Sequence, residues 1–529
     1  MRTALTTCLL AALLAAGALG QEVNEPIKTV AIGANRELRV NGKPFFPIMS
    51  WLQDTERYAK LRSLAMNTFV GNHQGKPPAR EMAELAQKAG GYAVPHFDGS
   101  GIGHAAVLGW IQGDEPDLTS QVSDAKVIGG SGLHINNSTP LSRIVDGVTH
   151  SWSVLDPLEG ASFTIELPQP VTIRSLAVWL TVSEGLSVPK EMVFLGDGRQ
   201  LLRTAVEAKR GRQKFALPQP ATFQKLEVQI PSVVPGKNVY GSISEVEAFD
   251  AEGKNVLEHK PLQKVRRTPA EVIRAYQQAK AADPDRPVFM TLTAQFLPQF
   301  AKLGEQQRKT LYPEFVKGAD VVGFDVYPIY GWGKPEWLDR VAQGTHALVE
   351  LAGPRRPVYA WIETCKGTKY ITYEKQKDVL PKHTRAEVWM AIIEGATGIG
   401  YFTHAWRPEF NPFAPTEDMQ QELARLNRQV TRLAPAILAA PAKSKIALAL
   451  EGDVPGHLKA TAQNRAIYVF AQNIDVKDRA AQGTIQVEGL RTGTKVEVID
   501  EHRTIVADEG RFNDRFDPLA EHIYRLPRE

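Results

Sequence analysis

Cysteine is nearly missing from this sequence: its 529 residues include Cys8 and Cys365 and no other cysteine. The run Cys8–Leu19 is apolar, follows Arg2 and ends in small residues, which is typical of a cleaved signal peptide over residues 1–20. A membrane anchor is the alternative, but the run is shorter than the ~20 residues that a membrane span needs. Removal of the peptide would leave one cysteine, which cannot form an internal disulfide. We therefore expect an exported bacterial protein, periplasmic or extracellular.

Long apolar runs are absent from the rest of the chain, so no membrane span is expected there. Basic runs are also absent: 62 Lys and Arg stand against 59 Asp and Glu, a formal net charge of +3. Nucleic acid is therefore a poor candidate partner. There is no Gly-rich loop of the phosphate-binding or dinucleotide-binding type. The 42 Gly and 35 Pro are scattered, and 43% of the residues are hydrophobic, which predicts a folded, soluble chain of several domains.

Short β-branched or aromatic runs alternate with helical-period segments from about residue 44, which predicts parallel βα units. Eight runs are predicted as strands: Phe45–Trp51, Met66–Asn72, Gly91–Phe97, Val107–Glu115, Pro287–Phe296, Asp320–Ile329, Pro357–Thr364 and Gly398–His404. Helices are predicted over Ala270–Ala282, with a capping box formed by Thr268 and Glu271, and over Thr384–Ala396. Eight such units predict a (β/α)8 TIM barrel, with an open doubly wound sheet as the alternative.

Between the fourth and fifth runs the pattern becomes strand-alternating and rich in Pro and Gly, as in Ser162–Leu167, Thr172–Leu180 and Lys225–Ile230. This predicts an all-β insert over residues 120–265. The remaining parts, residues 30–119 and 266–440, together have close to the ~250 residues of a (β/α)8 barrel.

After a predicted helix over Thr416–Leu433 and a Pro-containing connection, the chain is again β-like. Residues 441–529 predict a small antiparallel β-sandwich. The fold class expected is therefore multidomain: a TIM barrel, an inserted β-sandwich of the jelly-roll type and a C-terminal antiparallel β-sandwich.

Two glutamates stand at the ends of predicted strands. Glu115 ends the fourth run and Glu363 ends the seventh. A carboxylate after an apolar strand is unfavourable unless it is paired, hydrogen-bonded or functional, and a helix cap or ion pair is the common structural role of one such residue. Strands four and seven lie opposite each other in a barrel, and working residues lie at the carboxyl ends of the strands. Two carboxyls across a barrel mouth are what glycoside hydrolysis needs.

These residues resemble the large clan of retaining glycoside hydrolases with (β/α)8 barrels. In that clan the acid/base Glu lies in an Asn-Glu-Pro-like motif at the end of strand four, and the nucleophile Glu ends strand seven. The resemblance covers about residues 36–435 outside the insert and includes Leu38–Phe45, similar to the first strands of galactosidase-like members. It implies Glu115 as acid/base and Glu363 as nucleophile. This chain has Asp114 where the clan has Asn, and a carboxylate accepts but does not donate a hydrogen bond, which leaves the sugar open.

Further side chains at strand ends fit a sugar cleft, although a single residue of this kind is more often a core or capping residue. Tyr327 and Asp325 share a face at the end of the sixth run, where a Tyr can orient a carboxylate. His404 and Trp406 follow the eighth run, and an indole can stack on a pyranose ring. His96 follows the third run. The histidines lack the short spacing of zinc sites, so no cofactor is expected for catalysis.

The insert resembles the discoidin-like, coagulation factor type C domain. The segments that carry this resemblance are Arg143–Gly147, Trp152, Phe163–Val171 and Ile243–Phe249. Members of that family are jelly-roll sandwiches, many bind carbohydrate, and some hold a structural calcium. The resemblance implies Asp146 and Glu247 as calcium ligands, because calcium prefers hard oxygen donors. Capping of turns or pairing with Arg143 is the alternative role of these two acids.

The sequence thus predicts an exported glycoside hydrolase that cleaves a β-linked oligosaccharide or polysaccharide by a retaining double displacement, with the insert aiding capture. A carboxyl separation of ~5–5.5 Å would accompany retention, and ~6.5–9.5 Å would accompany inversion. One alternative is a glycan-binding or scaffold protein on a barrel that lost turnover, for which Asp114 is the hint. A transglycosylase with the same residues is another.

Overall fold

The computed structural model describes residues 24–72, 76–122, 125–131, 139–183, 185–259 and 262–527. The predicted signal peptide lies outside the described residues. Within the described ranges, no helix has both the length and the apolar character of a transmembrane segment. The chain divides into two compact units, one of residues 1–118 and 267–529 and the other of residues 119–266.

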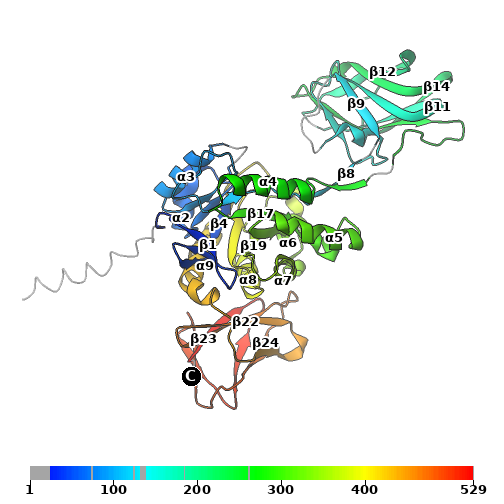
Figure 1. The fold of residues 1–529 in the computed structure, drawn as a ribbon. Coiled ribbons are helices and arrows are strands. Elements are labelled where there is room, and N and C mark those ends of the chain that lie inside the picture. The colour runs from blue at the N-terminus through cyan, green and yellow to red at the C-terminus, as the bar shows by residue number, and fades with distance from the viewer. Residues whose placement is uncertain are drawn as a thin grey trace, which may run out of the picture. The chain divides into compact units, whose positions relative to one another are not determined.

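Eight parallel strands form a barrel in the first unit (Figure 1). They are β4 (Ile48–Trp51), β5 (Thr68–Val70), β6 (Tyr92–Val94), β7 (Trp110–Ile111), β17 (Val288–Thr293), β18 (Val321–Asp325), β19 (Val358–Glu363) and β20 (Gly398–Phe402). The hydrogen-bonded order is β6-β5-β4-β20-β19-β18-β17-β7. Parallel bridges from Ala93 to Val107 and from His96 to Ile111 join the two ends of this order. The predicted barrel and all eight predicted strands are confirmed, and the open sheet is excluded.

Two large rings fill the barrel interior because each lies beside a glycine on the neighbouring strand. Tyr359 pairs with Gly323, and Trp361 pairs with Gly400. A Cβ on Gly323 would lie 2.1 Å from the Tyr359 ring, and one on Gly400 would lie 2.1 Å from the Trp361 ring. Both rings are at most 3% exposed. The packed interior therefore supports the strand ends from below.

Helices surround the strands. They are α2 (Tyr58–Ser63), α3 (Ala79–Lys88), α4 (Pro269–Ala282), α5 (Glu305–Phe315), α6 (Pro328–Trp332), α7 (Arg340–Ala352), α8 (Pro381–Ile393) and α9 (Glu417–Ile437). The capping box predicted for α4 is present: the Thr268 side chain accepts the Glu271 N–H, and the Glu271 side chain accepts the Thr268 N–H. A three-stranded antiparallel sheet of β1 (Val30–Ile32), β2 (Leu38–Val40) and β3 (Lys43–Phe45) precedes the barrel.

Two helices differ from their predicted bounds. Helix α8 begins at Pro381, a residue suited to the first helical position, and ends before Gly395, whose φ is +105°. Helix α9 continues through Pro435 to Ile437, so the predicted end at residue 433 was wrong. The Thr461 hydroxyl donates to the Ala436 carbonyl at 2.7 Å, which satisfies a carbonyl of the last turn.

The insert is an antiparallel β-domain with its own core. Its strands pair in the order β10-β15-β11-β14-β12-β13, with β9 also on β11. The strands are β9 (Lys126–Ser131), β10 (Ser153–Leu155), β11 (Ser162–Leu180), β12 (Val188–Gly196), β13 (Arg199–Ala205), β14 (Gly211–Val234) and β15 (Gly241–Phe249). Register shifts interrupt the pairing of the long strands β11 and β14, so each contributes to both halves of a sandwich. A short pair, β8 (Thr119–Val122) with β16 (Leu262–Val265), joins its two ends.

The C-terminal domain is the predicted antiparallel sandwich. One sheet has the order β21-β24-β27 and the other has the order β22-β23-β28-β25-β26. The strands are β21 (Ile446–Leu450), β22 (Gly456–Gln463), β23 (Ala466–Asn473), β24 (Ala481–Val487), β25 (Lys495–Val498), β26 (Arg503–Val506), β27 (Arg511–Phe516) and β28 (Glu521–Pro527). Trp389 of α8 stacks on Phe470 of β23 with ring centroids 5.9 Å apart, so the sandwich packs directly on a barrel helix.

Candidate active site

Glu115 lies in the loop after β7, at the carboxyl end of the barrel strands. Its φ is +46°, in the left-handed region that residues other than glycine rarely adopt. Such a backbone costs on the order of 1–3 kcal/mol and persists only where the surrounding structure imposes it. Pro116 follows directly and restricts the same loop further. The half-buried Glu115 side chain is therefore aimed by a constrained backbone.

Glu115 and Asp325 form a carboxyl pair across the ends of β7 and β18. Their side chains hydrogen-bond to each other, and Asp114 and Asp117 lie close enough to act on the same charge. Burial, followed by the charges of Glu115 and Asp114, raises the pKa of Asp325 well above its ordinary value. A hydrogen bond between two carboxyl groups requires a proton on one of them, so this pair retains a proton at neutral pH.

Asp117 fastens the Glu115 loop to the barrel. Its carboxylate accepts the Thr293 N–H at 2.8 Å, the Thr293 hydroxyl at 2.6 Å and the Tyr312 hydroxyl at 2.9 Å. The residue is 0% exposed. Burial raises the pKa of Asp117 to about 6, against the effect of these three donors. Strand β17 and helix α5 thus both hold the loop that carries Glu115.

Tyr327 lies two residues beyond Asp325 and keeps part of its surface accessible. Burial and then the charges of Asp325, Asp114 and Glu115 raise the pKa of Tyr327 well above its ordinary value. The phenol is therefore neutral, and it lies among the carboxyl groups that the sequence placed at this end of the barrel. The predicted neighbours Asp114, Glu115, Asp325 and Tyr327 are together.

Glu363 ends β19 and is 0% exposed. One carboxylate oxygen accepts the Ile329 N–H at 2.9 Å, and the other accepts the Tyr330 N–H at 2.6 Å. Both donors belong to the first turn of α6, immediately after Tyr327. The carboxylate of Glu363 therefore ties the end of β19 to the segment that follows Asp325 and Tyr327.

Glu387 of α8 is the second partner of Glu363, and sequence reasoning missed it. Glu387 is also 0% exposed, and its side chain hydrogen-bonds to the Glu363 side chain. Burial and then the charge of Glu363 raise the pKa of Glu387 well above its ordinary value. Burial likewise raises the pKa of Glu363, while the two amides and Glu387 lower it. The net result is a pKa of about 7 for Glu363, so its carboxylate forms as the pH rises through that value, with the two amides and Glu387 as partners.

The two predicted glutamates thus lie in two carboxyl pairs. The groups that shift the pKa of Glu363 are the Tyr330 and Ile329 amides and Glu387, and Glu115 is not among them. Glu115 instead faces Asp325. The role of Glu363 as nucleophile stays a prediction. An acidic residue at a buried position of a helix, such as Glu387 between Ala386 and Val388, is the signal that could have found the second pair.

The remaining predicted site residues lie at the same barrel end. His96 Nδ1 lies 2.8 Å from the Asn72 side-chain oxygen, and burial lowers the pKa of His96. His404 is 6% exposed, and its Nε2 lies 3.3 Å from the Leu52 carbonyl. Trp406 is 43% exposed, so its indole remains free to contact a ligand.

Asp146 and Glu247 of the insert have protein partners. Asp146 accepts the Val148 N–H at 2.8 Å. Glu247 accepts the Trp179 indole N–H at 3.1 Å and pairs with Arg212 at 2.7 Å. In the described part of the chain, no three His, Cys, Asp or Glu side chains form a group that could hold a metal ion. The calcium site stays a prediction.

Glu245 lies beside these two acids and was not predicted from the sequence. Its carboxyl accepts the Gly147 N–H at 3.0 Å. Burial raises the pKa of Glu245 to about 9, with smaller contributions from Asp146, Glu247 and Glu258. This part of the insert therefore carries a buried carboxyl that is protonated at neutral pH.

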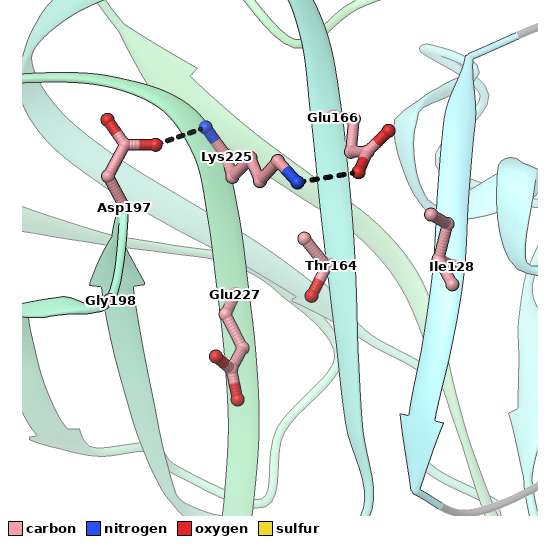
Figure 2. A pocket seen from close by; sticks show the side chains of 7 residues that line it. All are labelled: Ile128, Thr164, Glu166, Asp197, Gly198, Lys225 and Glu227. Atoms are coloured by element: carbon pink, nitrogen blue, oxygen red, sulfur yellow. Dashed lines mark hydrogen bonds and ion pairs between the residues drawn. The ribbon is translucent and has the colours of Figure 1, made fainter.

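A hollow of about 250 Å³ lies on the insert (Figure 2). Lys225 spans it: its ammonium pairs with Glu166 at 3.1 Å, and its backbone N–H donates to Asp197 at 2.9 Å. The residues lining it are Ile128, Thr164, Glu166, Asp197, Gly198, Lys225 and Glu227. None of them is aromatic, so this hollow offers no ring on which a sugar could stack.

No family model matches the chain, and no curated protein matches it. Among solved structures it is similar to the family 32 CBM from C. perfringens NanJ in complex with galactose, with 13% identity over 25% of this chain and 98% of that one and a TM-score of 0.21. It is also similar to an Anoxybacillus alpha-amylase, with 11% identity over 50% of this chain and 57% of that one and a TM-score of 0.35. An alpha-amylase from Geobacillus thermoleovorans in complex with acarbose has 11% identity over 50% of this chain and 58% of that one, with a TM-score of 0.34. At these values the activity has to be argued from the site itself.

Proposed function

We propose that the protein is a glycoside hydrolase whose active site lies at the carboxyl end of the barrel strands. The observation that carries the proposal is the hydrogen-bonded pair of Glu115 and Asp325, flanked by Asp114 and Tyr327. Burial and crowding of negative charge keep a proton in this pair at neutral pH. Protonation of the leaving oxygen is the step that a glycosidic bond needs and that an exposed carboxylate cannot supply at that pH.

In the proposed mechanism Glu115 is the acid/base and Glu363 is the nucleophile. The proton held by the Glu115–Asp325 pair passes through Glu115 to the glycosidic oxygen while a Glu363 oxygen attacks the anomeric carbon, and a glycosyl ester forms as the bond to the leaving group breaks. The Glu115 carboxylate then takes a proton from water. This water attacks the anomeric carbon from the side that the leaving group left, and the bond to Glu363 breaks. Two displacements retain the anomeric configuration.

The hydrogen bonds of Glu363 support an ionised nucleophile but also set a condition on it. Its oxygens accept the amides of Ile329 and Tyr330, and the proton of Glu387 adds a third donor. The side chain is also 0% exposed, so the atoms that cover it must move before one of its oxygens can reach an anomeric carbon.

A second candidate function is glycan binding without turnover. It is favoured by the complete burial of Glu363, whose two oxygens are both engaged by backbone amides. In that case the barrel and the insert would both be binding surfaces. Under either function we propose an exported protein, a glycan partner, and an insert that aids capture of the glycan.

The test is sugar release from a broad panel of aryl glycosides and polysaccharides, with Glu115→Gln, Glu363→Gln and the exposed control Glu336→Gln run beside the mature protein. We expect Glu115→Gln to lower hydrolysis by roughly 10²- to 10⁴-fold, the range of general acid–base catalysis. Glu363→Gln should abolish it, and Glu336→Gln should leave it unchanged. The anomer released first, followed by NMR, should retain its configuration.

Three outcomes would change the proposal. Full activity of Glu115→Gln would refute the acid role of the pair. Activity that survives in a folded Glu363→Gln variant, or an inverted product, would remove Glu363 as nucleophile while keeping the hydrolase. Silence of the folded wild type across the panel, together with measurable glycan binding, would favour the binding protein.

A further inference from the structure

Three exposed aromatic side chains gather on the loops that follow β19 and β20. Tyr370 is 75% exposed, Phe410 is 52% exposed and Trp406 is 43% exposed. The Trp406 and Phe410 ring centroids lie 4.9 Å apart. We call Tyr370, Trp406 and Phe410 the aromatic platform. Clustered apolar rings in water are costly, and such a patch typically marks a binding surface.

The two loops are joined directly, so the platform is built from a fixed backbone. The Gly367 carbonyl accepts the N–H groups of Trp406 at 2.6 Å and Arg407 at 3.0 Å. The φ of Gly367 is +125°, and a Cβ there would lie 2.4 Å from the Ala405 Cβ. Only glycine permits this approach, which places Gly367, two residues before Lys369, against the loop of Trp406.

Gln376 closes the first loop on itself. Its side-chain oxygen accepts the Gly367 N–H at 2.7 Å and the Thr368 N–H at 3.1 Å. Its side-chain amide donates to the Thr368 and Ile371 carbonyls, both at 2.8 Å. Four hydrogen bonds from one side chain hold the turn that presents Tyr370. A ligand would therefore meet the exposed ring with little loss of backbone entropy.

A continuous series of rings links the platform to the proposed catalytic carboxyls. Phe410 lies 6.1 Å from His404, His404 lies 5.2 Å from Phe402, and Phe402 lies 5.0 Å from Tyr327. Tyr327 in turn lies close enough to Asp325 that, after burial, the Asp325 charge raises the pKa of Tyr327. The platform and the Glu115–Asp325 pair thus belong to the same end of the barrel, and one glycan chain could contact both.

The platform carries a cation. The Lys369 ammonium lies 5.3 Å from the Trp406 ring and 5.4 Å from the Tyr370 ring. Lys366, three residues earlier, is paired with Asp378 at 2.8 Å. Within the described ranges, no carboxylate forms such a pair with Lys369. The aromatic faces hold this ammonium near the place where a sugar ring would stack.

We propose that the aromatic platform and Lys369 form a subsite for an anionic sugar, one that carries a carboxylate or a sulfate. The rings stack on the apolar face of the sugar, and Lys369 pairs with its anionic group. Arg407, exposed beside Trp406, adds positive charge to the same loop. A neutral sugar would gain the stacking but not the charge-assisted bond, which is about twice as strong as a neutral hydrogen bond. The proposal deepens the proposed function by naming its substrate class, but binding at the subsite does not require turnover.

The test is calorimetric titration of the full chain with matched pairs of oligosaccharides. Oligogalacturonate is compared with its methyl ester, and a sulfated galactan oligosaccharide is compared with its desulfated form. Each ligand is titrated into the wild type, Lys369→Gln, Trp406→Ala and the control Lys375→Gln, an exposed lysine of the same loop. Because any binding by the insert is common to all variants, differences between variants isolate the barrel subsite.

We expect the wild type to bind one of the charged ligands roughly tenfold more tightly than its neutral partner, as one charge-assisted bond predicts. Lys369→Gln should remove that preference, Trp406→Ala should weaken both members of the pair, and Lys375→Gln should change neither. The pair that shows the preference distinguishes carboxylate from sulfate.

Equal affinity for charged and neutral partners in the wild type would overturn the proposal. An undiminished preference in Lys369→Gln would overturn it as well. Hydrolysis of neutral glycans without any preference for charged ones would refute the subsite and leave the proposed hydrolase standing. Preferential binding of an anionic glycan that is lost in Lys369→Gln, with no hydrolysis of any glycan in the panel, would support the subsite and favour the binding protein over the hydrolase.

Discussion

Replacement of Asp117 by Asn is expected to remove a pH-dependent term from the stability of the barrel. The carboxyl of Asp117 is 0% exposed and accepts three hydrogen bonds from Thr293 and Tyr312. Burial raises the pKa of Asp117 from an ordinary 3.8 to about 6. The native state therefore binds the Asp117 proton more tightly than the unfolded chain does.

The magnitude follows from this shift. A difference of about two pKa units corresponds to about 3 kcal/mol, and it favours the native state while the proton is bound. This stabilisation is fully present below pH 3.8 and is lost as the pH rises through 6. Asn is neutral at every pH and resembles the protonated carboxyl in shape. The free energy of unfolding of Asp117→Asn, relative to the wild type, should rise by about 2 kcal/mol between pH 4 and pH 7, because part of the change lies outside this range.

The assay is calorimetric unfolding of both proteins across that pH range, with the transition of the barrel followed. Asp320→Asn is the matched control: Asp320 also accepts a backbone N–H, that of Val288 at 2.9 Å, and a Tyr hydroxyl, that of Tyr276 at 2.9 Å. Its side chain is 21% exposed and lies 3.6 Å from the Lys280 ammonium, so water and a cation reach it. Asp320→Asn thus measures the effect of the same substitution at a carboxylate that is not fully buried. A constant difference for Asp117→Asn over the whole range would refute the reasoning.

Three further predictions concern other parts of the first unit. Glu387→Gln keeps a donor to Glu363 and should preserve the fold. Glu387→Leu removes that donor from the buried Glu363 and should lower the free energy of unfolding by about 1–3 kcal/mol. Urea unfolding at pH 8 compares the two variants. Gly400→Ala should cost about 1–3 kcal/mol and alter the near-ultraviolet circular dichroism, because its Cβ would lie 2.1 Å from the Trp361 ring; an unchanged spectrum and stability would contradict the packing described. His457→Leu should loosen the C-terminal sandwich, because His457 Nδ1 lies 2.6 Å from Glu394, and limited proteolysis should detect this. Burial would raise the pKa of Glu394, but its hydrogen bonds to His457 and His346 lower it. The stabilisation is therefore present above pH 4.5 and disappears as the pH falls further. At that low pH the wild type and His457→Leu should become equally susceptible to the protease.

Much of the fold could be predicted because local signals agree with it. Apolar runs at the period of buried strands marked all eight barrel strands, although the observed strands are shorter, as for β7 at Trp110–Ile111. The Thr268 and Glu271 capping box fixed the start of α4 for a purely local reason. The end of α9 was not predictable in this way. It runs through Pro435, a residue that ordinarily ends a helix, so the local pattern placed the end too early.

The sequence predicted which residues belong to the site but not how they pair. The rule that working residues follow parallel strands selected Asp114, Glu115, Asp325 and Tyr327, and the structure brings these four together. The partner of Glu363 could not be predicted, because Glu387 is on a helix and carries no motif. Asp117 was also missed, although it follows Glu115 by two residues in the sequence.

The sequence by itself determined the fold class, the number of barrel strands and which residues stand at their ends, because these depend on hydrophobic period and turn chemistry along the chain. Only the tertiary structure decided how the carboxyls pair. Glu115 faces Asp325 and Glu363 faces Glu387. Proton sharing depends on burial and on through-space distances of a few ångströms between residues far apart in the sequence, and neither is encoded in any local pattern. The same holds for the exposed rings around Lys369, which two separate loops bring to one surface.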